Sequence, residues 1–134
     1  YESMPIEKLR LLSRALDKVE LHCDGDLIFS YITEEDYRIA GAGEEMTEGI
    51  IDHLRAVDGI RAAVVVRDQV SRGRASRKVS LRSGDDRTDV SALARRFGGG
   101  GHVRAAGCST DLEIGELVEE ICRGLDEQSG DRPA

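Results

Sequence analysis

The sequence predicts a single α/β domain with a mixed β-sheet of about five strands and helices packed on it. The chain has 134 residues, which is a usual size for one domain. Segments with the 3.6-residue spacing of helices alternate with short runs that are rich in β-branched residues. One of these runs, residues 60–68, is apolar over most of its length, as is typical of a central strand covered on both faces.

The first elements predicted are a helix and a hairpin. Apolar residues recur at helical spacing over residues 6–19, with Ser3 as a candidate N-cap and Pro5 in the first turn. Two short β-type runs then meet at Asp24-Gly25, a dipeptide that favours a two-residue hairpin turn. We therefore expect an antiparallel pair of strands directly after the first helix.

Two further helices are predicted before the central strand. Thr33 is followed three residues later by Asp36, which resembles a capping box, and Gly41 provides the stop of a short helix. Apolar residues over positions 46–57 indicate a second helix that ends at Gly59.

The second half of the chain alternates strands and helices. Residues 77–83 alternate apolar and polar side chains and are expected to pair with the central strand, after a basic loop over residues 69–76. The remaining predicted elements are a helix over 90–97 capped by Asp89, a single helical turn over 102–107, a brief strand over 108–110, a final helix over 114–125 and a frayed tail over 128–134.

Charge is distributed unevenly along the chain. The net charge is -7, yet residues 60–108 hold eleven Lys or Arg against four Asp, a local charge of +7. Such a distribution is typical of a protein with one face that meets an anion. A scatter of solvated surface arginines would give the same counts, so charge by itself leaves both interpretations open.

The cysteines and the apolar runs indicate the cellular compartment of the protein. Cys23, Cys108 and Cys122 are an odd, widely spaced set, which favours a reducing, cytosolic setting. No apolar run is long enough to cross a bilayer, and the first residues show no secretory signal, so we expect a cytoplasmic protein without a membrane partner. His22 and Cys23 have no second metal-ligand pair at zinc-motif spacing and are interpreted as two strand residues.

The four consecutive glycines at positions 98–101 are the most unusual feature of the sequence. Glycines allow backbone amides to approach an anion closely, which suits a phosphate. The run fits neither the dinucleotide fingerprint nor the P-loop pattern. A flexible linker is the alternative, but Phe97 and Ala105-Ala106-Gly107 flank the run with packable side chains.

Three polar residues near the glycines are candidates for holding that phosphate. His102 follows the run directly and can donate to a phosphate oxygen or act as an acid or base, although a packed or capping role is also open. Arg82 and Ser83 end a predicted strand, and strand ends are where α/β sheets usually bind ligands. Arginine offers a planar fork for a phosphate, and serine offers a hydroxyl donor.

The segments "KVSLRS" and "DVSALARRFGGGGHVRAAG" resemble the DHH-associated domain, the C-terminal domain of the Asp-His-His phosphoesterases. That family includes nanoRNases, pAp phosphatases and exopolyphosphatase-related proteins, and the resemblance extends over nearly the whole chain. Arg104 stands where many members have asparagine and adds a cation. The resemblance implies that the following residues bind substrate: Arg82, Ser83, Gly98, Gly99, Gly100, Gly101, His102 and Arg104.

The resemblance also implies a division of labour. Catalysis in the family depends on an N-terminal DHH domain that binds manganese, and this chain carries no matching motif: Asp52-His53 lies in a predicted helix and is not assigned to metal. We therefore expect a substrate-binding domain over residues 1–134, with residues 1–5 ending an interdomain linker, that is inactive without its DHH partner and takes short RNA or a pAp-like nucleotide. The alternatives are a non-catalytic single-stranded nucleic-acid-binding module, since related domains occur in alanyl-tRNA synthetase, and an interaction domain with a vestigial site.

Overall fold

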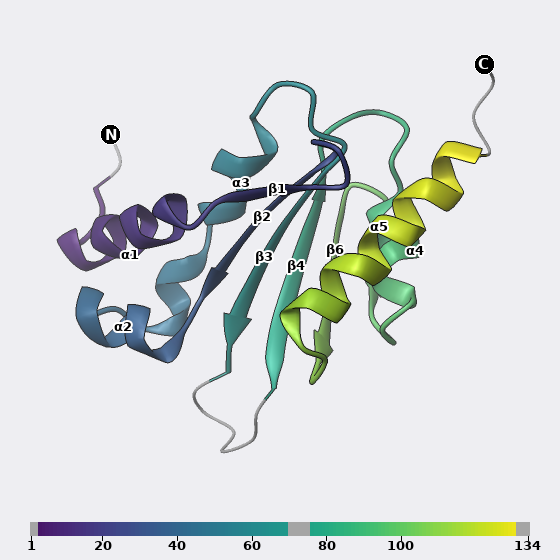
Figure 1. Ribbon diagram of the computed structural model, residues 1–134. Helices are drawn as coiled ribbons and strands as arrows, with labels where there is room; N and C mark the ends of the chain where they lie inside the picture. Colours follow the sequence, from purple (N-terminus) through teal and green to yellow (C-terminus); the bar gives the residue numbers. More distant parts are fainter. Residues whose placement is uncertain (1–2, 70–75, 131–134) are drawn as a thin grey trace.

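A six-stranded mixed sheet lies between two layers of helices in the computed structural model, which describes residues 3–69 and 76–130 (Figure 1). The strands are β1 (Glu20–His22), β2 (Leu27–Ile32), β3 (Ala62–Asp68), β4 (Arg77–Ser83), β5 (Gly100–Gly101) and β6 (Ala105–Thr110). The helices are α1 (Ile6–Asp17), α2 (Glu34–Ala40), the 3-10 helix η1 (Glu44–Thr47), α3 (Ile50–Arg55), α4 (Val90–Arg95) and α5 (Ile114–Gly130). The predicted α/β class and mixed sheet are confirmed, and the strand beyond the expected five is the short β5.

The sheet order is β1-β2-β3-β4-β6-β5, with β2 and β3 parallel and every other neighbouring pair antiparallel. The apolar run over 60–68 forms the interior strand β3, and β4 pairs with it as predicted. Residues 70–75, which belong to the predicted basic loop between these strands, lie outside the described residues.

Each face of the sheet has its own apolar core. Helices α1, α2 and α3 cover one face, where Leu11, Tyr37 and Leu54 pack against Ile28 and Val65. Helices α4 and α5 cover the other face, with a larger cluster of buried side chains that includes Phe29, Leu81, Leu93, Leu117 and Ile121 (Figure 1). No helix within the described residues is both long and apolar enough to cross a membrane.

The first half of the chain follows the prediction with three corrections. Pro5 occupies the N-cap position of α1, and Ser3 does not cap it. The hairpin turn spans residues 23–26 instead of two residues, because Gly25 N donates to the carbonyl of His22 and Asp26 N to that of Cys23. The helix predicted over 46–57 is divided into η1 and α3, because Gly49 has a left-handed φ of +89° between them.

Two of the three cysteines pair, although their odd number and wide spacing favoured a reducing setting. Cys23 lies in the hairpin turn and not in a strand, and it forms a disulfide with Cys122 of α5. The two residues are separated by 99 positions, so spacing patterns could not relate them. Cys108 stays free and buried.

Two predictions for the second half are wrong. Residues 102–107 form no helical turn: they make the connection from β5 to β6 and the first part of β6. The final helix does not fray from position 128 but continues to Gly130. Gln128 fixes this last turn to α4, because its side chain accepts a hydrogen bond from Asp89 N and donates one to Asp89 O, each at 2.9 Å. The Asp89 cap of α4 and the Thr33–Asp36 capping box of α2 are confirmed.

Candidate functional site

The fold explains three of the four glycines. Gly98 has a left-handed φ of +81° just after α4, and Gly99 N returns to the carbonyl of Ala94, as at many helix ends. A Cβ on Gly99 would lie 2.2 Å from the carbonyl oxygen of Gly107, and Gly101 has a φ of +143° against β6. At Gly100, by contrast, a Cβ would meet nothing within 4 Å, so its lack of a side chain leaves open space beside the strand.

The second half of the glycine run, Gly100 and Gly101, is therefore the edge strand β5. Gly100 pairs with Gly107 and Gly101 with Ala106, and among the described residues no strand pairs with β5 on its other side. The hairpin closes at His102 and Ala105, whose backbones exchange hydrogen bonds of 2.8 Å and 3.1 Å. An edge strand presents unpaired backbone donors and acceptors, so the predicted anion-binding loop takes the form of a glycine edge.

The register aligns this edge with β4. Arg82 pairs with Ala105, which in turn faces His102 across the hairpin, while Ser80 pairs with Gly107, which faces Gly100. Neighbouring strands lie about 4.8 Å apart, so the backbones of Arg82 and His102 are separated by roughly 10 Å, two strand spacings. Arg82 and His102 thus lie in one row across the sheet, with Ala105 between them.

One face of β4, β6 and β5 is open to solvent. Along β4 and β6 the side chains of one face are buried and the alternate ones are exposed or half-buried, because α4 and α5 cover only one side. We call the uncovered side the open sheet face; its residues are Lys78, Ser80, Arg82, Gly100, Ala105, Gly107 and Ser109.

Arg82 is a cation of this face that has no acidic partner within the described residues. Its Nη1 donates to the carbonyl of Leu81 at 3.0 Å. Arg82 and Ser80 also line a cleft of about 340 Å³ between β4, β3 and the segment 44–51. A guanidinium without a carboxylate partner, half-buried beside a cleft, is suited to bind a phosphate.

The far wall of that cleft is acidic and is hydrogen-bonded to β3. Glu44, Glu45 and Glu48 line it together with Thr47. Arg67 of β3 holds the wall in place, because its Nη1 donates to the Thr47 hydroxyl at 3.2 Å and to the carbonyl of Glu44 at 3.4 Å. The cleft therefore has a basic floor and an acidic rim.

Ser83 does not join Arg82 on the open sheet face. Adjacent residues of a strand point to opposite faces, and Ser83 is buried on the side of α4 and α5. Its hydroxyl donates to the carbonyl of Asp85 at 2.5 Å, and its amide donates to the carbonyl of Arg104 at 2.9 Å. In this structure Ser83 fixes the turn after β4.

His102 is exposed and oriented by its neighbour. The backbone N–H of Arg104 donates to Nδ1 of His102 at 3.1 Å. A ring nitrogen that accepts a hydrogen bond carries no proton, so the neutral ring bears its proton on Nε2. His102 can thus offer an Nε2–H donor to a ligand.

Arg104 lies in a different depression from Arg82. Its guanidinium pairs with the carboxylate of Asp86 at 3.2 Å and approaches the carbonyl of Asp85 at 3.4 Å. The depression, of about 210 Å³, is lined by residues 85–89 with Val103 and Arg104. The extra cation of this sequence is therefore already paired with an acid.

Three residues beside the predicted site were missed. Ser80 and Lys78 share the open sheet face with Arg82, and Arg67 supports the cleft from β3. The period-two alternation of "KVSLRS" was the available signal, since it places positions 78, 80 and 82 on one face and 83 on the other.

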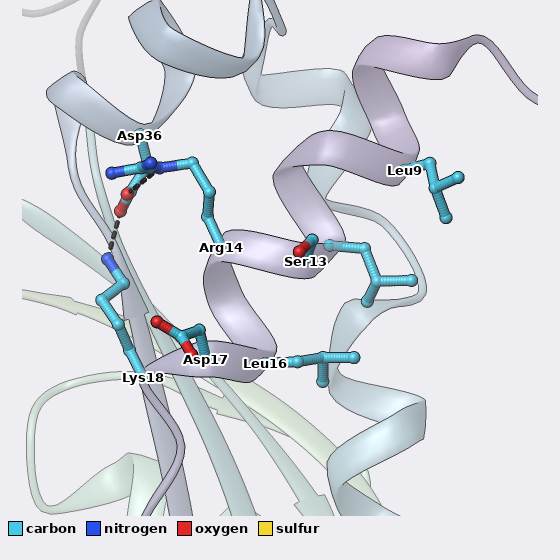
Figure 2. A pocket seen from close by; sticks show the side chains of 8 residues that line it. Leu9, Ser13, Arg14, Leu16, Asp17, Lys18 and Asp36 are labelled. Atoms are coloured by element: carbon cyan, nitrogen blue, oxygen red, sulfur yellow. Dashed lines mark hydrogen bonds and ion pairs between the residues drawn. The ribbon is translucent and has the colours of Figure 1, made fainter.

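A third cavity, of about 630 Å³, lies along α1 and differs in the chemistry of its lining. Figure 2 shows Arg14 and Lys18 both reaching Asp36, while Leu9 and Leu16 point the other way. Burial alone would raise the pKa of Asp36, but hydrogen bonds from Lys18, Thr33 N and Arg14 lower it to about 2. Because both cations bind this buried carboxylate, the cluster stabilises the fold and is not our candidate site.

The described residues offer no metal centre. Nowhere in ranges 3–69 and 76–130 do three His, Cys, Asp or Glu side chains gather in a way that could hold a metal ion. Asp52 and His53 are both exposed on α3.

Known proteins resemble this chain in sequence and in fold. Its sequence is 32% identical over 127 residues to the bifunctional oligoribonuclease and PAP phosphatase NrnA of Thermus thermophilus, covering 92% of this chain and 36% of that protein. A segment of 42 residues, 31% of this chain, is 55% identical to the oligoribonuclease NrnB of Bacillus subtilis and covers 10% of it. The fold superposes on the crystal structure of an exopolyphosphatase-related protein from Bacteroides fragilis with a TM-score of 0.81, 21% identity and coverage of 97% of this chain and 37% of the other.

The chain thus spans little more than a third of the length of the relatives that it matches most fully. The DHHA1 domain family matches residues 12–129, which include every strand and every residue of the open sheet face. This chain belongs to the DHHA1 domain family.

Proposed function

We propose that this DHHA1 domain binds the end of a short oligoribonucleotide, or a small nucleotide such as pAp, and presents it to the catalytic domain of a phosphoesterase. The observation that carries the proposal is a row formed by Arg82 and Ala105 of the open sheet face and by His102, which pairs with Ala105 across the hairpin. In that row an arginine without a carboxylate partner lies on the same surface as a glycine edge with open space beside it. Both features suit a phosphate with an attached nucleoside.

Arg82, His102 and Gly100 have separate tasks in the proposal. Arg82 takes two phosphate oxygens with its planar fork. His102 donates from Nε2 to a further oxygen, and Gly100 allows the ligand to approach the backbone of β5. Ser83 and Arg104 do not contact the ligand in this proposal. They stabilise the turn after β4 and the turn between β5 and β6.

The hydrolytic step belongs to a DHH domain, for which the family resemblance implies manganese. Holding a substrate in the correct position can supply much of the rate advantage of an enzyme. We expect this chain by itself to bind nucleotide without hydrolysing it, and to support turnover in a protein that also holds a DHH domain. A cytoplasmic location stays a prediction from the sequence, which fractionation of cells can test.

Calorimetric titration with pAp and with a 5′-phosphorylated RNA dinucleotide tests the proposal. A hydrogen bond to a charged group contributes about 1.5–3 kcal/mol, so Arg82→Ala is expected to weaken binding at least tenfold. The matched control is Arg123→Ala, which removes an exposed arginine from α5 in the opposite layer. Equal affinities for the two variants would contradict the proposed site.

The dependence of binding affinity on oligonucleotide length and on salt concentration distinguishes the proposal from its main alternative. A domain that recognises an end binds di- and trinucleotides as well as it binds longer strands. A module for long single strands would bind more tightly as the strand lengthens and would lose affinity steeply with salt. The second pattern would replace the proposal by the non-catalytic binding module.

A further inference from the structure

The disulfide between Cys23 and Cys122 connects the first hairpin to the last helix. Cys23 lies in the turn between β1 and β2, Cys122 lies within α5, and their Cα atoms are 5.6 Å apart. Both side chains are half-buried against the core beneath α5. Neither residue is among the fully buried ones.

The backbone at Cys23 points to a role for its sulfur. Cys23 and Asp24 have φ values of +56° and +55°, in the left-handed region. Among residues with a Cβ, Asp and Asn tolerate this region best, and cysteine is not favoured there. Glycine or asparagine would adopt this backbone conformation at lower free energy than cysteine. The side chain of Cys23 forms the disulfide with Cys122 of α5.

The third cysteine does not compete for this bond. Thiol–disulfide exchange requires a thiolate. Cys108 is buried in β6, and burial raises the pKa of its thiol to about 11. Exchange at this domain is thus confined to the other two cysteines.

Helix α5 is also held at its C-terminal end without the disulfide. The buried guanidinium of Arg61 donates to the carbonyl of Leu125 at 3.1 Å and to the hydroxyl of Ser129 at 2.7 Å, and it pairs with Asp26 at 3.3 Å. Leu117, Val118, Ile121 and Leu125 are buried under the helix. Reduction would therefore release one tether and leave the helix in place.

We propose that Cys23 and Cys122 form a reversible redox modification site, oxidised by low-molecular-weight disulfides and reduced by dithiols. One cysteine thiolate attacks the oxidant disulfide, which releases one thiol and leaves a mixed disulfide. The second thiolate then displaces the remaining thiol, so two protein thiols are oxidised and one disulfide is reduced to two thiols. Reversibility agrees with the expected cytoplasmic location, where disulfides of most organisms are transient.

The expected effect follows from the size of the closed loop. Crosslinking residues 99 positions apart removes chain entropy from the unfolded state. The chain-entropy relation for a loop of this size gives a change of about three thousandfold in the folding equilibrium constant, as an upper limit. By linkage, folding favours the disulfide over the dithiol by the same factor.

The test combines thiol counting with urea unfolding of the whole chain. After equilibration with oxidised glutathione, neither Cys23 nor Cys122 should react with a maleimide, and the protein mass should lie two hydrogens below that of the dithiol form. After treatment with a dithiol, both cysteines should be alkylated and the urea midpoint should fall. A second treatment with oxidised glutathione should restore both measurements.

The variants Cys122→Ser and Cys23→Ser provide the control. Each should unfold at one midpoint whether or not reductant is present, because no bridge can form. The proposal is overturned if the unchanged protein keeps two reactive thiols in oxidised glutathione, if it stops at a mixed disulfide, or if its midpoint is the same in both redox states. None of these measurements depends on nucleotide binding.

Discussion

Substituting alanine for two adjacent glycines, Gly99 and Gly100, separates what the fold requires of the glycine run from what a ligand requires. A Cβ on Gly99 would lie 2.2 Å from the carbonyl oxygen of Gly107 and 2.5 Å from the Cβ of Cys108. A Cβ on Gly100 would meet no atom within 4 Å, and Gly100 is not among the glycines with a left-handed φ. An added methyl group therefore clashes with β6 at position 99, whereas at position 100 it extends into open space.

The magnitudes of the two effects differ. Carbon atoms pack at about 3.5–4.0 Å, so Gly99→Ala requires β5 and β6 to separate by about 1 Å. Overpacking of this kind costs about 1–3 kcal/mol, and each strained ladder hydrogen bond adds about 1 kcal/mol. We expect Gly99→Ala to lose about 3 kcal/mol, or about 10 °C in Tm for a domain of this size. Gly100→Ala should stay within about 1 kcal/mol of the unchanged protein.

Thermal unfolding and nucleotide titration give the two readouts. Gly100→Ala should keep its Tm and lose most of its affinity for pAp, because the methyl group fills the space beside β5. Equal Tm values for the two variants would refute the close packing of Gly99 against β6. Unchanged affinity in Gly100→Ala would refute the close approach of ligand to β5.

Two further predictions concern the polar contacts that hold the helices. The pKa of Asp36 is lowered to about 2 in the fold, so its contribution to the free energy of unfolding is present above pH 4 and is lost as the pH falls from about 4 to about 2. The expected loss is about 2 kcal/mol in urea midpoints measured across that range, and Asp36→Asn should flatten the profile. Asp89→Ala removes the cap whose carboxylate accepts from Ser91 N and Ala92 N, and should cost about 1 kcal/mol in the same assay, while the backbone bonds to Gln128 remain.

Local patterns in the sequence were sufficient for most elements. The capping box at Thr33 and Asp36, the cap at Asp89 and the apolar run of β3 each depend on neighbours within a few positions, and all three were predicted correctly. The alternation along β4 even contained the correction for Ser83, because a period of two places it opposite Arg82. Local rules of this kind hold wherever the chain folds, because their partners are adjacent in sequence.

The sequence by itself determined the α/β class and the DHHA1 family. It also indicated Arg82, His102 and the glycines as candidate ligand-binding residues. Only the tertiary structure decided that Gly100 and Gly101 form β5, since glycine has little intrinsic preference for a strand and needs β6 to pair with. It also decided the row from Arg82 to His102 and the bond from Cys23 to Cys122. These pairs are 20 and 99 positions apart, and no local rule relates them: they meet because burial of two apolar cores sets the strand order and the place of α5.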